Sequence, residues 1–255
     1  MRARSLLVAV LLVIAAGVSL GASTPPRAKT APPPPFQVLV FTKTEGFRHG
    51  SIPAAVRMLR GLGARGGFTV TATEDAAVFA DARLARYRVV VFCLTTGDIL
   101  DPGQQTALRR YVRRGNGFVG IHSAADTEHG WPWYGRLLGA RFASHPDVQR
   151  ASIDVVDRRH PSTAHLPARW EREDEWYNLD RSPRGSARIL ATLDETSYAA
   201  GEQGMGADHP IAWSHSPEGG RSWYTGGGHT PESYGEPLFR QHVLGGIRWA
   251  ARRSP

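Results

Sequence analysis

Short apolar runs separated by amphipathic stretches constrain the fold of this chain more than any other feature. Runs of this length without polar interruption are typical of strands buried on both faces of a sheet. They occupy residues 38–41, 89–94 and 118–121, with a mixed run at 68–72. Amphipathic stretches between them predict two helices, one from Ser51 to Gly63 and one from Asp101 to Gly115. This alternation predicts a three-layer α/β sandwich with a mainly parallel central sheet.

The second half of the chain is less regular than the first. Further strands are predicted at residues 152–156, 188–193, 211–213 and 223–224. Long polar loops join these strands. From residue 238 to 251, Phe239, Val243 and Ile247 recur at helical spacing, which predicts a final amphipathic helix.

The N-terminus has the pattern of a signal peptide over residues 1–23. Arg2 and Arg4 precede an apolar run over residues 6–18, and small residues follow it. A run of this length is short for a bilayer span, which needs about 20 apolar residues. We therefore expect a secreted or extracytoplasmic protein without a stable membrane span after cleavage, or a membrane-anchored one if the segment stays uncleaved. Residues 24–35 are Pro-rich and predict a linker, so the folded domain is expected at 36–255.

The charge and cysteine content exclude two classes of protein. The chain has 31 Lys and Arg residues against 23 Asp and Glu residues, and four of the basic ones precede residue 30, which leaves 27 in the predicted domain. These basic residues are scattered and no nucleic-acid-binding motif accompanies them, so nucleic-acid binding is not expected. Cys93 is the single cysteine, so no intramolecular disulfide exists. Its place in an apolar run predicts a buried structural residue.

Polar residues with useful chemistry follow several of the predicted strands. Open α/β sheets bind ligands beyond the carboxyl ends of their strands. The loops expected to line that rim are 42–50, 95–101 and 122–131. His49 lies in the first of them, His122 begins the third, and His229 follows the last predicted strand. Polar residues on loops held by a rigid scaffold are where function concentrates.

Two of these segments resemble parts of class I glutamine amidotransferases. Residues 119–122 resemble the strand-to-helix elbow that carries the catalytic cysteine of those enzymes, and residues 229–232 resemble their late histidine–acid motif. Here the nucleophile position is His122, and Cys93 lies on another strand. Without a thiolate the thioester chemistry of a glutaminase has no nucleophile, so glutaminase activity is not expected.

From Phe36 to Arg252 the chain more closely resembles the ThuA-like (trehalose-utilisation) family. The segments that carry this resemblance are residues 47–49, 95–98, 120–123, 145–146, 160–161, 174–177, 208–213 and 227–229. The resemblance implies a flavodoxin-like, class I glutamine amidotransferase-like fold. It also implies a role in disaccharide catabolism, in which sugars are processed through 3-keto intermediates.

The histidines in Gly- or Pro-bounded loops are the candidate chemical groups. We expect His122, His229 and His49 to be catalytic together with Glu175. The same three histidines and His209 are the candidate ligands of a divalent metal ion such as zinc, although no cofactor is certain. A metal ion polarising a sugar carbonyl or activating water is one hypothesis. Metal-free acid/base catalysis by His122 and His229 is the other, and the sequence leaves both open.

Other residues are expected to bind the sugar or only to shape the fold. The candidate substrate-binding residues are Asp126, Trp131, Asp174, Trp176, Tyr177 and His209. His145 and His160 each precede a proline and are interpreted as turn residues. The remaining histidines, which have no assigned role, are His129, His165, His215 and His242.

The leading hypothesis is an extracytoplasmic enzyme that acts on a glycoside or 3-keto sugar by hydrolysis, elimination or isomerisation. The alternative is a non-catalytic carbohydrate-binding module on a degenerate amidotransferase scaffold. A titratable cluster favours the enzyme, whereas an aromatic platform alone favours the module.

Overall fold

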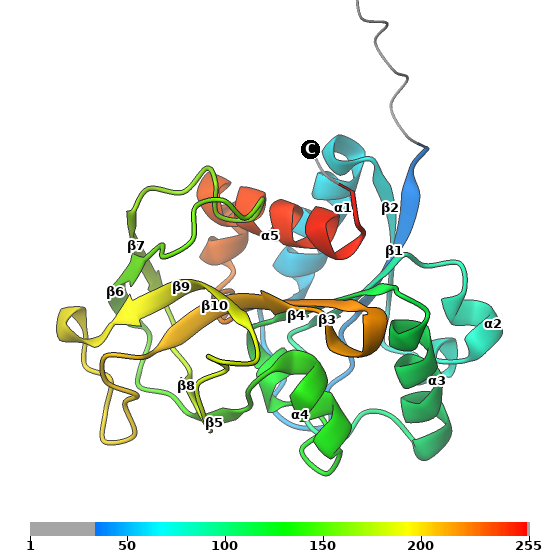
Figure 1. The fold of residues 1–255 in the computed structure, drawn as a ribbon, viewed down its shortest axis with the longest axis horizontal. Coiled ribbons are helices and arrows are strands. Elements are labelled where there is room, and N and C mark those ends of the chain that lie inside the picture. The colour runs from blue at the N-terminus through cyan, green and yellow to red at the C-terminus, as the bar shows by residue number, and fades with distance from the viewer. Residues whose placement is uncertain (1–33, 254–255) are drawn as a thin grey trace, which may run out of the picture. The chain divides into compact units, whose positions relative to one another are not determined.

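In the computed structural model, which describes residues 34–253, the predicted apolar runs form one half of a nine-stranded sheet (Figure 1). This half is parallel, with the strand order β2-β1-β3-β4-β11. Its strands are β1 (Phe36–Phe41), β2 (Phe68–Thr73), β3 (Val89–Cys93), β4 (Gly117–Ile121) and β11 (Arg221–Thr225). The order second-first-third-fourth-fifth is that of flavodoxin-like doubly wound folds. Every residue of β3 and β4 is buried, as the continuous apolar runs predict.

The other half of the sheet is antiparallel and continues the order as β10-β9-β6-β7. Its strands are β6 (Gln149–Asp154), β7 (Arg169–Asp174), β9 (Arg188–Asp194) and β10 (Pro210–His215). Two short strands, β5 (Phe142–Ser144) and β8 (Asn178–Leu179), form a separate antiparallel pair. Strand β7 lies at the edge of the sheet, farthest in strand order from β2.

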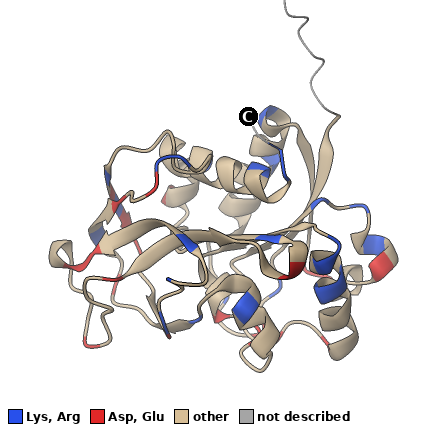
Figure 2. Ribbon diagram, viewed as in Figure 1, with Lys and Arg blue, Asp and Glu red and all other residues tan. Residues whose placement is uncertain are grey.

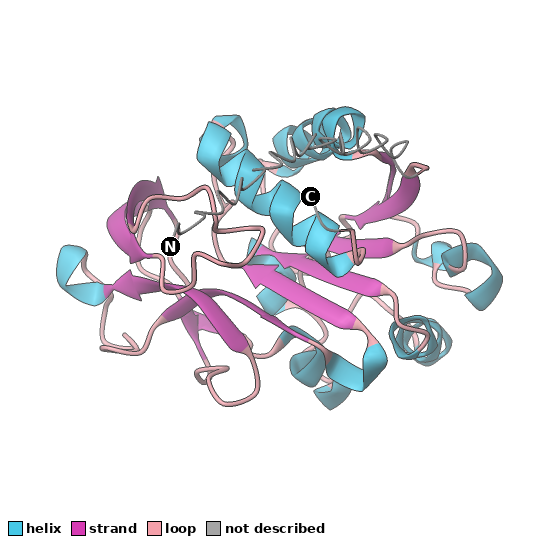
Figure 3. Ribbon diagram, turned by 45° about the horizontal axis from the view of Figure 1, so that its top comes forward, coloured by secondary structure: helices cyan, strands magenta, loops and turns pink. Residues whose placement is uncertain are grey.

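Helices cover both faces of the sheet (Figures 1 and 3). On one face lie α1 (Ile52–Gly66) and α5 (Pro237–Ala250), and on the other lie α3 (Pro102–Arg113) and α4 (Pro132–Leu138). Residues alternate along the parallel strands between the two cores: Val38 packs with α1 and α5, whereas Leu39 packs with α3 and α4. Full burial of one such aliphatic side chain contributes about 1.5–3 kcal/mol. The three-layer α/β sandwich predicted from the sequence is therefore confirmed.

The ends of the helices refine the predictions made from the sequence. A capping box between Asp101 and Gln104 begins α3, as the predicted start at Asp101 requires. Ser51 precedes α1, but its side chain caps no backbone group. That helix continues past the predicted end at Gly63 and stops at Gly67, which has the left-handed backbone (φ 72°) that glycine adopts without strain. A further single-turn helix, α2 (Asp81–Leu84), precedes β3.

Strand β7 was not predicted, because its sequence is dominated by charged residues. Alternate side chains along it are buried, and two of these, Arg172 and Asp174, form an ion pair of 3.2 Å. Burying two opposite charges together removes the apolar signal by which strands are recognised. Elsewhere Lys and Arg lie on helices and loops of both faces rather than along one stripe (Figure 2).

The predicted signal peptide and most of the predicted linker lie outside the described residues. Of the Pro-rich segment, Pro34 and Pro35 are described, and β1 begins directly after them. Among residues 34–253, no helix combines the length and the apolar character that crossing a membrane requires.

Candidate functional site

The loops that follow the parallel strands meet at one rim of the sheet, as predicted. Thr44 pairs with Thr96, and Gly97 pairs with Thr127, so the loops after β1, β3 and β4 lie side by side. The carboxyl ends of these strands flank the point between β1 and β3 where the strand order reverses, which is where doubly wound folds bind ligands.

His122 lies at the sharp turn directly after β4. Its backbone has a φ of 51°, a strained value for a residue with a side chain, and it begins a short 3-10 helix over His122–Asp126. The side chain is fully buried. Its Nδ1 donates to the Gly226 carbonyl at 2.8 Å, and because a carbonyl only accepts, a neutral His122 presents the lone pair of Nε2 to the site. Tyr224 Oη donates to the His122 carbonyl at 2.9 Å and holds the turn.

His229 is positioned by a carboxylate at the end of β7. The backbone N–H groups of Gly228 and His229 donate to Asp174 at 2.7 and 2.9 Å. Gly228 has a φ of 113°, and a Cβ there would lie 2.7 Å from Tyr234 Oη, so the loop needs glycine. Arg172 neutralises Asp174 in return. The fully buried Asp174, predicted to bind substrate, therefore holds the loop that carries His229.

Four side chains meet in one cluster, which we call the histidine–glutamate cluster: His49, His122, Glu175 and His229. One potential ligand atom from each lies within 4.8 Å of the others. His122 Nε2 is 3.3 Å from Glu175 Oε2, and His229 Nδ1 is 3.1 Å from the same oxygen. His229 Nδ1 and His122 Nε2 are 3.3 Å apart.

His49 completes the cluster from the loop after β1. Its ring centre lies 5.0 Å from the rings of both His122 and His229, in edge-to-face arrangements. Burial, reinforced by the two neighbouring histidines, lowers the pKa of His49 to about 3. His49 is therefore neutral near pH 7 and keeps a nitrogen lone pair.

Glu175 supplies the negative charge of the cluster. Burial raises the pKa of Glu175, but its interactions with His122 and His229 outweigh burial and hold that pKa well below the usual range. The hydrogen bond to Glu175 in turn raises the pKa of His229 against the opposing effect of burial. The cluster thus combines an ionised carboxylate, a histidine that readily takes a proton and one that stays neutral.

The spacing of the three closest atoms fits a coordinated metal ion. Ligands at 2.0–2.1 Å from a tetrahedral zinc ion lie about 3.3 Å from one another. The three measured separations, 3.1–3.3 Å, match such edges. Imidazole nitrogen and carboxylate oxygen are also the donors that catalytic zinc and related divalent ions use. The residues of the cluster therefore fit a divalent cation.

The structure buries two aromatic residues that were predicted to bind the sugar. Trp176 is fully buried and its Nε1 donates to the Gln149 carbonyl, so its ring faces cannot stack on a sugar. Tyr177 is also buried, with its ring centre 4.1 Å from that of His122, where it packs against the cluster. Asp126 contacts His129 Nε2 at 2.8 Å, and Trp131, half-buried, packs on Trp133.

His209 does not join the other three histidines, contrary to the prediction. Its Nε2 donates to the Tyr177 carbonyl at 2.8 Å, and its Nδ1 contacts Glu195 Oε1 at 2.6 Å. The residue immediately precedes β10 in the antiparallel half of the sheet. Both ring nitrogens already have protein partners, so neither lone pair is free for a metal ion.

Two residues beside the cluster were missed as site residues. His145, interpreted as a turn residue, places Nδ1 3.2 Å from Glu175 Oε1, and 42% of its side chain is exposed. Phe47 is 65% exposed, and its ring centre lies 4.9 Å from that of His49. The available signal was proximity in sequence: Phe47 lies two residues before His49.

Comparisons with known proteins bear on the fold and the family. A ThuA-like protein from Bacteroides uniformis superposes with a TM-score of 0.73 at 23% identity, covering 89% of this chain and 95% of that one. One from Parabacteroides merdae gives 0.71 at 22%, covering 85% and 90%. A β-galactosidase from Bacillus circulans sp. alkalophilus gives 0.57 at 14%, covering 86% of this chain and 32% of that enzyme. These likenesses show the fold.

No curated protein matches this chain. The family model ThuA, described as trehalose utilisation, matches residues 37–250. That match covers nearly all of the folded domain, including every member of the histidine–glutamate cluster. The protein therefore belongs to the ThuA family.

Proposed function

We propose that this protein is an extracytoplasmic, metal-dependent enzyme of sugar catabolism that acts on a glycoside or a 3-keto sugar. The observation that carries the proposal is the convergence of His49, His122, Glu175 and His229 from distant parts of the chain. Three ionisable imidazoles and a carboxylate are costly to bury without a common partner. Their place at the ligand-binding rim and the family's link to trehalose utilisation support a sugar as substrate.

The four cluster residues would hold the cation. A bound divalent ion polarises a carbonyl oxygen or makes water a nucleophile near neutral pH, and both suit hydrolysis, elimination or isomerisation of a sugar. Gly226 fixes the tautomer of His122, and Asp174 fixes the backbone of His229. Such partners orient ligands and raise their basicity.

His145 is the residue best placed to move a proton at this site. It is partly exposed, contacts Glu175 Oε1, and lies on the side of the carboxylate away from His122 and His229, which contact Oε2. Imidazole is the side chain that most often serves as a general acid or base, so His145 can take a proton from a sugar hydroxyl or carbon and return it to the product. Phe47 offers an exposed ring beside His49 against which a pyranose face can pack.

The test is turnover with and without metal. Protein purified without chelator is assayed with trehalose and with its 3-keto derivative, then stripped with EDTA and reloaded with Zn²⁺ or Mn²⁺. We expect activity to be lost on stripping and restored on reloading, and Glu175→Gln to lack it under all conditions. Arg86→Gln, which removes an exposed arginine outside the cluster, is the control and keeps full activity.

Two outcomes contradict the proposal. Full turnover by stripped protein shows metal-free acid/base catalysis by the histidines. Sugar binding without turnover in any metal state favours the non-catalytic binding module.

The extracytoplasmic part of the proposal rests on the N-terminal sequence alone. Arg2 and Arg4 followed by the apolar run at residues 6–18 direct the chain to the secretion pathway. We expect the mature N-terminus between Gly21 and Pro25 when the chain is expressed with its own N-terminus in a bacterial host. N-terminal sequencing of the exported protein checks this, and retention of Met1 or Arg2 contradicts it.

A further inference from the structure

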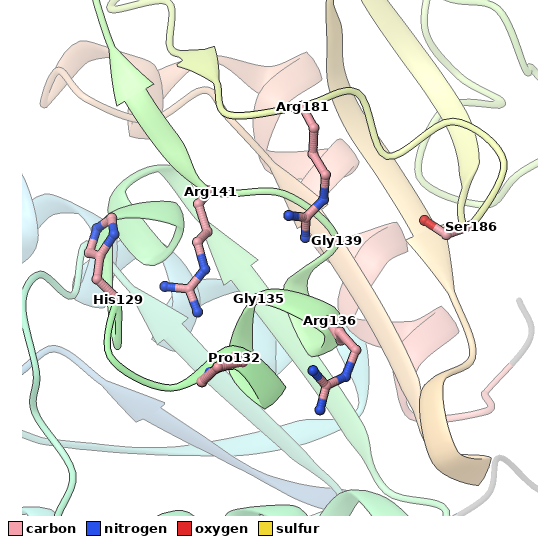
Figure 4. A pocket seen from close by; sticks show the side chains of 8 residues that line it. All are labelled: His129, Pro132, Gly135, Arg136, Gly139, Arg141, Arg181 and Ser186. Carbon is pink, nitrogen blue, oxygen red and sulfur yellow. The ribbon is translucent and has the colours of Figure 1, made fainter.

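A second polar pocket lies beside α4 and shares no residue with the histidine–glutamate cluster. Its volume is about 640 Å³, within the 300–1,000 Å³ of typical small-molecule sites. Arg136, Arg141, Arg181 and His129 line it together with Ser186. Figure 4 shows Arg141 and Arg181 extending toward the same hollow, with Arg136 and His129 at its borders.

The positive charge of this pocket exceeds the negative charge around it. Arg136 makes no hydrogen bond or ion pair with any residue that the structure describes. Arg181 pairs with Asp180 at 3.2 Å, and both side chains are partly exposed. No carboxylate in the part of the chain that the structure describes lines the pocket itself. Exposed ion pairs contribute little stabilisation. The guanidinium of Arg181 can therefore exchange Asp180 for a ligand at little cost.

Arg141 is held rigidly in this pocket by groups that carry no charge. Its two terminal nitrogens donate to the carbonyls of Glu128 and Trp131 at 3.0 and 2.7 Å. A Cβ on Gly135 would lie 2.6 Å from Arg141 Nε, so the guanidinium packs directly on the backbone of α4. The carboxylate of Asp180 accepts from the backbone N–H of Arg141 rather than from its side chain. The positive charge of Arg141 is therefore oriented but not neutralised.

The other charged groups around the pocket do not cancel this excess. Among residues 34–253, Asp126 is the one further carboxylate that forms an ion pair with a lining residue, and it pairs with His129 at 2.8 Å. The last carbonyls of α4 are also occupied, because Trp213 Nε1 donates to Leu138 and His215 Nε2 to Leu137. These carbonyls at the C-terminal end of α4 therefore already have hydrogen-bond partners and do not bind the arginines.

We propose that this pocket binds the phosphate or carboxylate group of a small anionic metabolite. Guanidinium groups present planar pairs of donors that match oxyanions, and Ser186 adds a hydroxyl. Three arginines, two of them on or just after α4 and the third at residue 181, form a site for such a group in which Arg141 is preorganised. The volume leaves room for a sugar-sized body attached to the anion. This site is independent of the metal chemistry proposed above.

The test is calorimetric titration of EDTA-stripped full-length protein at low ionic strength. The probes are inorganic phosphate, glucuronate as a carboxylate of sugar size, and glucose as the neutral control. We expect one or both anions to bind and glucose not to bind here, with the better anion identifying the physiological group. The double variant Arg136→Gln/Arg181→Gln weakens that binding roughly tenfold or more. It removes two exposed side chains, so its melting temperature stays close to that of the parent.

Arg86→Gln is the matched control, since it removes an exposed arginine outside the pocket. We expect this variant to bind the anion like the parent. The proposal is overturned if the double variant binds as tightly as the parent, if Arg86→Gln loses as much affinity, or if the parent binds neither anion at millimolar concentration. His122→Ala, which disrupts the cluster, leaves anion binding intact and so separates this site from the metal site.

Discussion

The buried histidines of this molecule fall into two groups that differ in what their ring nitrogens contact. His242 on α5 donates from Nδ1 to the Ser162 carbonyl at 2.8 Å and contacts Thr225 Oγ1 through Nε2 at 3.2 Å. Both ring nitrogens of His209 have protein partners as well. The cluster histidines instead direct nitrogens at one another and at Glu175. Burial is common to both groups, so it is the convergence of several potential ligand atoms on one point that marks a site.

The pKa values alone do not separate these two groups. Burial lowers the pKa of His242 to about 3, and burial followed by its cluster neighbours lowers that of His49 to about 3. The same shift thus accompanies a packing role in one case and a ligand-type position in the other. Perturbed pKa values point to a site only together with converging geometry.

The largest expected difference between the groups is in metal affinity. Structural zinc sites with four ligands bind with about 10–16 kcal/mol, so loss of one ligand is expected to weaken binding about a hundredfold to a thousandfold. We expect this of His122→Ala, measured by competition with a chromophoric chelator. His209→Gln is the matched control and keeps the affinity of the parent. Equal losses of metal affinity in both variants would show that the cluster histidines bind metal no differently from His209.

The reverse contrast is expected in stability. His242 packs between Trp223, Trp170 and Phe239, so His242→Ala leaves a cavity and an unpartnered Ser162 carbonyl. We expect a loss of about 3 kcal/mol in the free energy of unfolding, measured by urea denaturation with EDTA present. His122→Ala under the same conditions loses less, since it also relieves a crowded set of polar groups. A greater loss for His122→Ala would show that the cluster is structural.

Stability should also depend on pH through the packing histidines. Burial lowers the pKa of His242 to about 3 and that of His160 to about 4, against about 6.5 in the unfolded chain. Between these values the unfolded state binds more protons, so their contribution is complete above pH 6.5 and is lost as pH falls toward 4. For each such histidine, the free energy of unfolding falls by at most about 1.4 kcal/mol per pH unit as the pH is lowered. We expect His242→Gln to show a shallower loss between pH 6.5 and 4.5 than the parent, and an unchanged slope contradicts this.

The smallest expected effect concerns the rim beside the cluster. Phe47 is exposed, and its ring meets that of His49 in an edge-to-face arrangement. Phe47→Ala is expected to weaken sugar binding about fivefold, the order of one aromatic contact of about 1 kcal/mol, with metal affinity unchanged. Titration with sugar and metal on the same preparation measures both. Phe47→Leu keeps apolar area without the flat ring, and full binding by that variant would show that stacking is not involved.

The sequence predicted those parts of the fold and site that depend on local pattern. Uninterrupted apolar runs identified β3 and β4, and the rule for carboxyl ends of parallel strands placed His49 and His122 at one rim. Strand β7 was not predicted, because two of its buried positions carry Arg172 and Asp174, which form an ion pair, instead of apolar residues. His209 was predicted as a ligand because β10 begins at the same edge of the sheet, beside the end of β11, but its ring nitrogens contact Glu195 and the Tyr177 carbonyl, and the sequence does not reveal these partners.

The separation of the cluster residues along the chain has a consequence for how the molecule is made. His49 follows the first strand, Glu175 follows the edge strand β7, and His229 follows the last strand. A nascent chain therefore has no complete site until nearly all of it has been synthesised and both halves of the sheet have paired. An ion bound at that stage would join the loops after β1, β4, β7 and β11 in addition to the hydrogen bonds between them. At a hundred times its Kd it would add about 2.7 kcal/mol against unfolding. Metal supply would thereby govern how long each molecule survives proteolysis.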